Sequence, residues 1–417
     1  MTQHTRLDRL HLADYVLPGD AVAWPQGPGE PLALTELLLA QRKDLGRPEL
    51  IFGLTGSATL TPDLADDFAL RALNGAGNSR RVTAQAEITI GHVSWMPRLI
   101  RSGAIRVDVA LIQVRPLPGG QYSLGVICDF TQAMIESART VIALVNPALP
   151  PMRGDAVVAA DDIDLLVEGD ARVLDLPDPQ PSAIDLQVAR HVAALIPDGA
   201  TIQLGVGTLP VAVAAALHGH RDLGVHSGVV SDVLIELIER GVVNNSRKGR
   251  DQGKTVTGGL FGTQKLRDFA QAHDLIDMRC ADYTHHLAVT SSLHRFQTIN
   301  SAIEVDLTGQ VNAEVAGGRY LGAVGGQVDF VRAGVASEGG RSFIALPSTT
   351  PDGRTSRIVA SLDGRPVTTA RSDVDTIVTE YGAAQLMGCS LQERCRRLVA
   401  IAHPDHRDAL MRAWQTA

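Results

Sequence analysis

Short apolar runs, glycine-rich turns and amphipathic stretches follow one another along this chain. In the middle of the sequence, the apolar run 200–204 is followed by the turn Gly205–Pro210 and by an alanine-rich run at 211–217. Continuous apolar runs indicate strands that are covered on both faces. The turn residues and the alanine run predict a helix with proline in its first turn, where the missing N–H is no loss.

The same order is repeated directly afterwards. An apolar run at 223–226 leads into Ser227 and Gly228, and a helical pattern spans 233–240 with Asp232 as its expected cap. Strand, glycine turn and helix in alternation predict an open α/β sheet. Sites in such sheets lie at the carboxyl ends of the strands.

The pattern also recurs in the first part of the chain. A strand at Gly19–Trp24, a turn at 25–31 and a helix at 32–42 match the segment 199–217 at an offset of about 180 residues. Each copy is followed by a second strand, at Leu50–Gly56 and Leu223–Gly228. We therefore expect two similar α/β halves.

A proline-rich stretch at 175–182 is the best linker, and it divides the chain into predicted domains at 1–180 and 181–417. The remaining predicted helices are a lead-in at 1–18, a helix at 183–195, and helices over 390–416 with a break at His403–Pro404. Further strands are predicted at 106–114, 122–127, 140–146, 297–305, 343–346 and 376–379. A glycine loop is predicted at 322–330.

The amino-acid composition limits the classes of function that fit this chain. The net charge of −8 does not favour nucleic-acid binding, and no apolar stretch reaches membrane-spanning length. The N-terminus has no signal-peptide core, and the four cysteines include no C-x-x-C pair. We expect a cytoplasmic protein with free thiols and no metal site.

Two glycine-rich turns are candidate ligand contacts. Gly205-Val206-Gly207 is either a tight turn or a cradle of backbone N–H groups, and Pro210 argues against a dinucleotide fingerprint. Gly325-Gly326-Gln327 is either a bulge or a pair of donors for a developing oxyanion.

Several polar residues lie at predicted strand ends. His226 is a structural histidine or a general base, and Asn300 is an amide among apolar neighbours. Glu304 and Glu380 are strand-end carboxylates. The histidines at 285, 286 and 294 do not have the spacing of a common metal site.

These stretches resemble the acetyl-CoA hydrolase/transferase family of class I CoA-transferases. The resemblance covers nearly the whole chain, and the segments that carry it are 203–210, 223–227, 299–310, 325–330, 378–382 and 401–405. It implies two similar α/β domains, coenzyme A as part of an acyl-CoA substrate, a carboxylate as second substrate, and a homodimer or higher homo-oligomer.

The family mechanism implied by the resemblance is covalent. A glutamate attacks an acyl-CoA, and the returning CoA thiolate forms a glutamyl-CoA thioester that the acceptor carboxylate then attacks. In the alignment that glutamate directly follows the His-Ser pair, where this chain has Gly228. The usual nucleophile is therefore missing, and Glu30, Asp282 and Glu304 are the candidate replacements.

The resemblance also assigns contacts. Gly325 and Gly326, with Gln327, correspond to contacts of the thioester oxyanion, and Asn300 to a polar residue near the reacting carbonyl. Gln203, Gly205, Val206 and Gly207 correspond to the CoA pocket, and Gln26 with Glu30 to the substrate pocket in the first turn. The predicted catalytic positions are thus Gly228, His226, Asn300 and Glu304. The other residues are predicted to bind CoA or the second substrate.

Three functions are open at this point. The chain is a CoA-transferase-type enzyme acting on a short-chain acyl-CoA, an acyl-CoA hydrolase that uses an activated water with His226 as a general base, or a catalytically silent acyl-CoA-binding homologue or subunit. The family favours transfer, whereas the missing glutamate favours hydrolysis.

Overall fold

The computed structural model describes residues 2–416 and divides the chain into two compact units, each built around its own mixed α/β core. The first unit comprises the chain up to Pro177 together with Val256–Thr284 and Arg319–Gly325. The second comprises Asp178–Thr255, His285–Gly318 and the chain from Gly326 onward.

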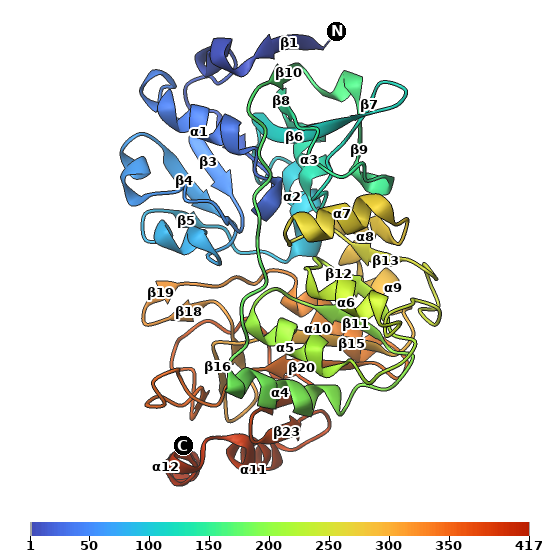
Figure 1. The fold of residues 1–417 in the computed structure, drawn as a ribbon. Coiled ribbons are helices and arrows are strands. Elements are labelled where there is room, and N and C mark those ends of the chain that lie inside the picture. Colours follow the sequence, from blue (N-terminus) through green and yellow to red (C-terminus); the bar gives the residue numbers. More distant parts are fainter. Residues whose placement is uncertain (1, 417) are drawn as a thin grey trace. The chain divides into compact units, whose positions relative to one another are not determined.

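The first unit holds a sheet in the order β1-β10-β8-β6-β2-β3-β4-β5, whose neighbouring strands run parallel (Figure 1). β7 pairs antiparallel with β6, and β9 pairs with β7. The strands are β1 (Gln3–Arg6), β2 (Ala21–Ala23), β3 (Glu49–Phe52), β4 (Ala69–Ala72), β5 (Glu87–Ile88), β6 (Val109–Leu117), β7 (Gln121–Ser123), β8 (Thr140–Val145), β9 (Val157–Ala159) and β10 (Leu165–Glu168).

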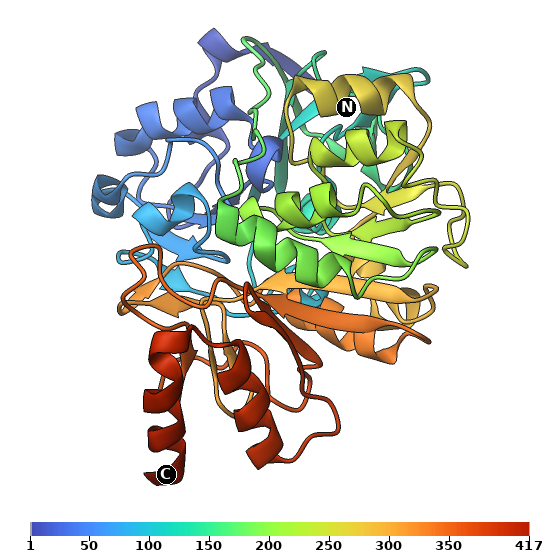
Figure 2. The ribbon, with the colours of Figure 1, turned by 60° about the horizontal axis from the view of Figure 1, so that its bottom comes forward.

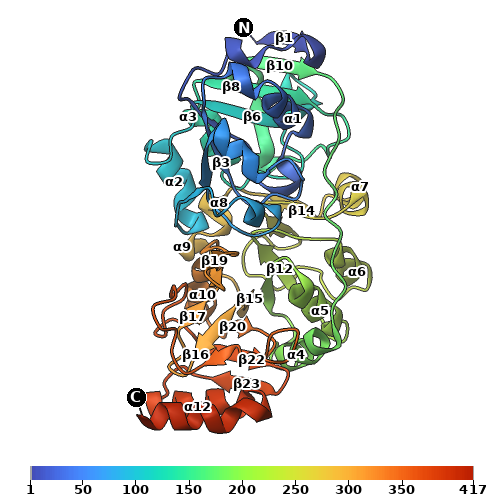
Figure 3. The ribbon, with the colours of Figure 1, turned by 90° about the vertical axis from the view of Figure 1, so that its left-hand side faces the viewer.

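Helices cover both faces of this sheet. α1 (Leu32–Ala40) packs its leucines against the apolar side chains of β2 and β3, in a core that includes Leu34, Leu50 and Phe52. α2 (Met96–Arg101) and α3 (Thr131–Ser137) pack against each other on the other face (Figure 3). The continuous apolar strands follow from this double cover.

Two later segments belong to this first unit although the predicted boundary lies near residue 180. The segment Val256–Thr284 contains β14 (Ile276–Met278), α7 (Gln264–Ala272) and α8 (Ala281–Thr284), and β13 (Thr255–Thr257) lies where the chain enters it. Backbone hydrogen bonds join this segment to Cys128 and Asp129. The segment therefore belongs to the first unit through its contacts, although it comes later in the chain.

The second unit contains a sheet in the order β12-β11-β15-β20-β22-β23. The strands are parallel except for β23, which is antiparallel to β22. Their bounds are β11 (Thr201–Leu204), β12 (Gly224–Ser227), β15 (Phe296–Ser301), β20 (Arg341–Ala345), β22 (Thr376–Thr379) and β23 (Gly382–Gln385).

Two layers of helices enclose that sheet. α4 (Ala183–Ala193), α5 (Thr208–Ala216) and α6 (Val233–Glu239) lie on one face, and α9 (Leu287–Thr290) and α10 (Gln327–Ala336) on the other (Figure 3). The C-terminal α11 (Leu391–Ile401) and α12 (Pro404–Thr416) pack against each other beyond β23, as Figure 2 shows in red. Small sheets are formed by β16 (Glu304–Asp306), β17 (Val311–Asn312) and β21 (Ile358–Val359), and by β18 (Val315–Ala316) and β19 (Arg319–Tyr320).

The predicted repeat corresponds to β2-α1-β3 in the first unit and β11-α5-β12 in the second. In both, the two strands are parallel neighbours. The α/β architecture predicted from the sequence is confirmed.

Some local predictions were wrong. The lead-in at 1–18 contains β1 and two 3₁₀ turns, because its first residues pair with β10. The stretch 297–305 forms two strands, β15 and β16, in different sheets. The glycine loop ends at Gly326, the N-cap of α10, because residues from Gln327 onward are helical. None of the helices within residues 2–416 has the length and apolarity needed to cross a membrane.

Candidate active site

The turn after β11 lies at the edge of the second unit's sheet where the parallel strands have their carboxyl ends. Gly207 has φ 119° and ψ −178°, a conformation that is essentially restricted to glycine. It forms the N-cap of α5 without a side-chain capping bond. The N–H groups of Thr208 and Leu209, in the first turn of that helix, therefore carry the positive end of the helix dipole.

An open pocket of about 540 Å³ lies at this turn, entirely within the second unit. It is bounded by Val206 and Gly207 after β11, by Ser301 at the end of β15 and by Ala345 at the end of β20. Its other lining residues are Ser182, Ile184, Asp185, Thr208, Leu209, Pro210, Ala302, Leu346, Pro347, Thr349, Thr350, Pro351 and Arg357. Parallel α/β sheets place their ligand sites at this edge.

Arg357 gives this pocket a positive charge. Burial lowers the pKa of its guanidinium, and the carboxylates of Asp185 and Glu380 act in the opposite direction. The Asp185 carboxylate is engaged by Ser182 in a capping box at the start of α4, and Ser348 donates two hydrogen bonds to Glu380. The pocket thus combines a half-buried guanidinium with the N-terminal turn of α5, which suits an anionic ligand.

Gln203 and Asn300 lie side by side on neighbouring strands. The Asn300 amide donates to Oε1 of Gln203 at 3.4 Å, and the same oxygen accepts from the N–H of Ile299 at 3.2 Å. The sequence resemblance assigned Gln203 to the CoA pocket and Asn300 to the reacting carbonyl, and the structure places the two side chains in contact on β11 and β15.

Gly228 follows β12, and its environment differs from that of a flexible turn. A Cβ atom built on Gly228 would lie 2.8 Å from Cε1 and 2.9 Å from Nε2 of His285. Gly228 does not have a positive φ. A larger residue here is thus opposed by the position of the His285 ring and not by backbone conformation.

The same ring lies against Gly326. A Cβ atom on Gly326 would lie 2.6 Å from Nε2 and 2.7 Å from Cδ2 of His285. Gly326 has φ −91°, which any residue can adopt. The imidazole of His285 thus fills the space beside both glycines, with Nε2 nearest to the pair.

Aromatic packing holds the His285 ring in place. Its centroid lies 4.6 Å from that of Phe330 on α10, and Phe330 meets Phe296 at 6.3 Å. The His285 side chain is 6% exposed. Burial lowers its pKa to about 3, so the imidazole is neutral at neutral pH.

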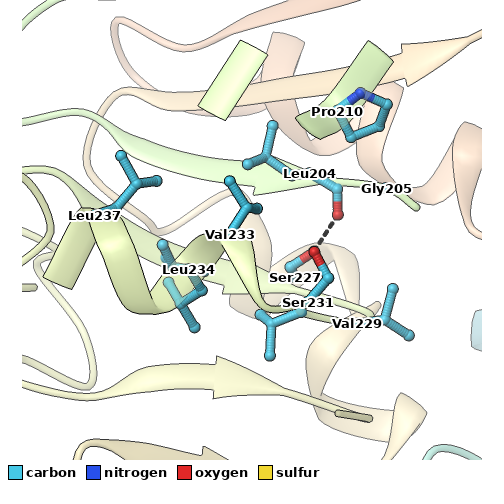
Figure 4. A pocket seen from close by; sticks show the side chains of 11 residues that line it. Leu204, Gly205, Pro210, Ser227, Val229, Ser231, Val233, Leu234 and Leu237 are labelled. Carbon is cyan, nitrogen blue, oxygen red and sulfur yellow. Dashed lines mark hydrogen bonds between the residues drawn. The ribbon is translucent and has the colours of Figure 1, made fainter. Parts of the chain in front are cut away.

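His226 points to the other side of its strand. Val225 and Ser227 line a small cavity of about 20 Å³ beneath α5 and α6, so strand alternation places His226 on the opposite face. There its ring, which is 0% exposed, meets Phe296 edge-on at 6.2 Å. In the cavity, the Ser227 hydroxyl donates to the Leu204 carbonyl at 2.6 Å and ties β12 to β11 (Figure 4).

The remaining glycine-loop residues have separate partners. Gly325 has φ 55°, and its carbonyl accepts a hydrogen bond from the N–H of Val93 at 3.0 Å. Gln327 begins α10, and its amide donates to the Thr369 hydroxyl at 3.1 Å. Asp232 occupies the N-cap of α6 but makes no side-chain capping bond.

The candidate carboxylates are already engaged. Glu304 lies in the small sheet of β16, where Asn312 and Arg365 donate to it at 2.7 and 2.5 Å. Asp282, in the first unit, pairs with Arg101 at 2.7 Å. Neither carboxylate is held as a free nucleophile.

Gln26 and Glu30 lie in the first unit. The Gln26 amide donates to Asp129 at 2.9 Å and accepts from the N–H of Leu54. Glu30 is 0% exposed, and the hydroxyls of Thr35, Thr55 and Thr59 donate to its carboxylate. Burial raises the pKa of Glu30, and these hydrogen bonds oppose the increase.

Sequence reasoning missed two residues. His285 was considered only for metal binding, and Arg357 was not considered. The adjacent His285-His286 pair was a visible signal, but its contact with Gly228 spans distant parts of the chain. Within residues 2–416, no group of three or more His, Cys, Asp or Glu side chains is arranged to hold a metal ion.

Comparisons with known proteins match both parts of the chain. Residues 2–176 match the acetyl-CoA hydrolase/transferase N-terminal domain, and residues 262–414 match the corresponding C-terminal domain. A 4-hydroxybutyrate coenzyme A transferase from Clostridium kluyveri is 38% identical over 94% of this chain and 92% of its own length.

Solved structures give the same result. The crystal structure of RipA from Yersinia pestis has a TM-score of 0.92 at 32% identity, covering 99% of this chain and 97% of that one. A 4-hydroxybutyrate CoA-transferase from Porphyromonas gingivalis has a TM-score of 0.84 at 32% identity, with the same coverage.

Proposed function

Because the chain belongs to the acetyl-CoA hydrolase/transferase family, and is thus an enzyme of CoA-transferase or acyl-CoA hydrolase type, we propose that it transfers CoA from a short-chain acyl-CoA to a carboxylate. We further propose that the acceptor attacks the thioester directly. The observation that carries this proposal is Gly228, where the family resemblance expects a glutamate and where His285 fills the adjacent space.

Direct transfer balances without an enzyme nucleophile. The acceptor carboxylate attacks the thioester carbonyl, the C–S bond breaks, and CoA thiolate leaves a mixed anhydride. The thiolate then attacks the acceptor's carbonyl in that anhydride, forming the new thioester and releasing the original acyl group as a carboxylate. Glu304 and Asp282 are held in ion pairs and Glu30 is buried, which supports an external acceptor.

The pocket beside α5 supports binding of the CoA part of the substrate. CoA carries phosphates, and the guanidinium of Arg357 together with the first turn of α5 offers donors to such anions. Gln203, Gly205, Val206 and Gly207 belong to this part of the proposal. Gly325, Gly326 and Gln327, with Asn300, are proposed at the thioester end, and Gln26 with Glu30 at the substrate pocket.

Hydrolysis is the second candidate function, and Gly228 favours it as well. Water can take the place of the acceptor carboxylate once no glutamate captures the acyl group. His226, which the sequence proposed as the base for that water, is enclosed beside Phe296, so this route needs another group.

The same proposal places the enzyme in the cytoplasm as a homodimer or higher homo-oligomer. Its four cysteines, at positions 128, 280, 389 and 395, are free thiols, which suits a reducing compartment.

Steady-state kinetics test the proposal. The protein is assayed with acetyl-, propionyl- and butyryl-CoA, with and without acetate or butyrate, and thioesters and free CoA are followed by mass spectrometry. New thioester with intersecting initial-rate lines is expected, because both substrates must be bound together. Parallel lines would indicate a covalent enzyme intermediate and contradict direct attack. Free CoA without acceptor would identify a hydrolase, and no product would identify a silent homologue.

A further inference from the structure

The guanidinium of Arg357 has no protein partner in the pocket beside α5. Across residues 2–416 it donates no hydrogen bond and takes part in no ion pair, although the residue is half-buried. Its backbone N–H alone is engaged, because it donates to the carbonyl of Ser348 at 2.8 Å. A guanidinium carries several N–H donors in a fixed plane, and it is costly to leave them unpaired when they are withdrawn from water. The side chain therefore offers these donors to an anion that enters the pocket.

A carboxylate lines the same pocket and limits which anion fits. Asp185 is 7% exposed, and the backbone N–H and the hydroxyl of Ser182 donate to its Oδ2 at 2.9 and 2.7 Å. In the part of the chain that the structure describes, Oδ1 of Asp185 accepts no hydrogen bond. A carboxylate repels a bare phosphate, but it accepts hydrogen bonds from ribose hydroxyl groups. Arg357 and Asp185 together therefore favour a phosphate that is attached to a sugar.

Exposed apolar side chains form another part of the pocket wall. Ile184, in the first turn of α4, is 40% exposed, and Val206, in the turn after β11, is 45% exposed. Pro210, Leu346 and Pro347 extend this apolar wall. The volume of about 540 Å³ also lies within the range of small-molecule sites, which is about 300–1,000 Å³. The wall is suited to bury the flat base of a nucleotide.

We propose that the pocket beside α5 is a nucleotide subsite that binds an adenine nucleotide, either as the nucleotide end of acyl-CoA or as a free nucleotide. Arg357 binds its phosphate, Asp185 accepts a hydrogen bond from its ribose, and Val206 contacts its base. This inference rests on the proposed function, because acyl-CoA is the substrate that brings an adenine nucleotide to the protein. It adds a form of regulation, since free adenine nucleotides compete with acyl-CoA for this pocket.

Calorimetric titration of the intact protein tests the subsite without any need for turnover. The probes are adenosine 3′,5′-bisphosphate, ADP and inorganic phosphate. Both nucleotides should bind, and CoA should displace them. Inorganic phosphate lacks the ribose and the base, so it should bind more weakly than ADP by about 10-fold or more.

Two substitutions separate the phosphate contact from the base contact. Arg357→Gln should raise the Kd of ADP about 10-fold or more, because it removes the charged donor. Val206→Ser should raise the Kd of ADP about 3- to 10-fold and leave that of inorganic phosphate unchanged. The matched controls are Arg354→Gln and Val367→Ser, since both residues are exposed and neither lines the pocket. Thermal melting verifies that each variant is folded.

Kinetics give a second readout that a merely structural role would not produce. ADP should inhibit competitively toward acetyl-CoA and noncompetitively toward the acceptor carboxylate. Acetyl-pantetheine carries the thioester but lacks the nucleotide. Arg357→Gln should therefore lower kcat/KM for acetyl-CoA about 10-fold or more and leave kcat/KM for acetyl-pantetheine unchanged.

Each result decides one point. A Kd of ADP that is the same in wild type and Arg357→Gln would overturn the subsite, and so would an equal loss in Arg354→Gln. Inorganic phosphate that binds as tightly as ADP would overturn the contacts with ribose and base. An equal fall of kcat/KM for acetyl-CoA and acetyl-pantetheine in Arg357→Gln would also contradict a nucleotide contact. Wild-type protein without turnover would contradict the proposed function, whereas ADP binding that depends on Arg357 would still support the subsite.

Discussion

A Cβ atom on Gly228 would approach the imidazole of His285 to 2.8 Å at Cε1 and 2.9 Å at Nε2. Contacts this short force one of the two residues to move. The absence of a side chain at position 228 and the presence of the ring at 285 are therefore one packing arrangement. A side chain introduced at 228 must therefore displace the ring of His285 or be accompanied by a smaller residue at 285.

This relationship predicts the outcome of introducing the glutamate. Gly228→Glu alone should form no covalent intermediate, and the overpacked ring should destabilise the fold by about 1–3 kcal/mol. The double variant Gly228→Glu/His285→Asn removes Cε1 and Nε2, the two clashing atoms. It should therefore accept the glutamate and form a glutamyl-CoA thioester.

Intact-protein mass spectrometry after incubation with acetyl-CoA measures this intermediate as an added CoA. Gly228→Ala is the matched control, because it adds the clashing Cβ without a carboxylate. A CoA adduct on the single variant Gly228→Glu would show that the ring moves freely and would contradict the packing argument.

The lowered pKa of His285 predicts a pH dependence of stability. In the unfolded chain this histidine takes up a proton near pH 6.5, whereas in the folded protein it stays neutral down to about pH 3. The unfolded state therefore binds more protons between these values, and stability falls as pH decreases through that window. Between pH 7 and pH 5 the loss from this group is about 2 kcal/mol.

Urea unfolding of wild type and His285→Phe at pH 7 and pH 5 checks this expectation. The variant lacks the titrating group, so its free energy of unfolding should fall less over the same interval. An equal fall in both proteins would mean that His285 titrates normally in the folded state.

Arg357 is expected to govern binding rather than chemistry. Arg357→Gln removes the guanidinium from the pocket beside α5, and a hydrogen bond to a charged group contributes about 1.5–3 kcal/mol. KM for acyl-CoA should rise about 10-fold or more, with little change in kcat. The control is Arg354→Gln, an exposed arginine in the same loop. An unchanged KM and an unchanged Kd for CoA would remove this pocket from the CoA site.

Glu30 predicts an opposite dependence on pH. Because burial raises its pKa in the folded protein, its protonated form contributes stability at low pH, and this contribution is lost as pH rises through the raised folded pKa. Glu30→Gln stays neutral at every pH. Its melting temperature relative to wild type should therefore increase from pH 5 to pH 8.

The same variant tests whether Glu30 takes part in the reaction. Loss of transfer activity in a stable Glu30→Gln protein would support a role in the substrate pocket, whereas full activity would assign the carboxylate to the packing of Thr35, Thr55 and Thr59. Melting curves that shift in parallel at both pH values would contradict the raised pKa.

The local elements and their class could be predicted from the amino-acid pattern alone. Apolar runs such as 200–204 and 140–146 predicted buried parallel strands, because strands covered on both faces have no polar alternation. The turn before α5 could be predicted because it needs, at position 207, a backbone conformation that residues other than glycine avoid. The glycine in the sequence therefore marks the turn. These features depend on neighbours in the chain, and so the repeat and the α/β architecture could be predicted.

Contacts between side chains that are distant in the sequence could not be predicted in the same way. Nothing in the local pattern around residue 285 relates it to Gly228 or Gly326, since their contact depends on how β12, α10 and the segment before α9 pack. Likewise, the direction of His226 follows from the face of β12 that meets Phe296, and the segment 256–284 joins the first unit through hydrogen bonds to Cys128 and Asp129. Strand order and packing across the sheet set these contacts, and they are properties of the folded chain rather than of any single stretch.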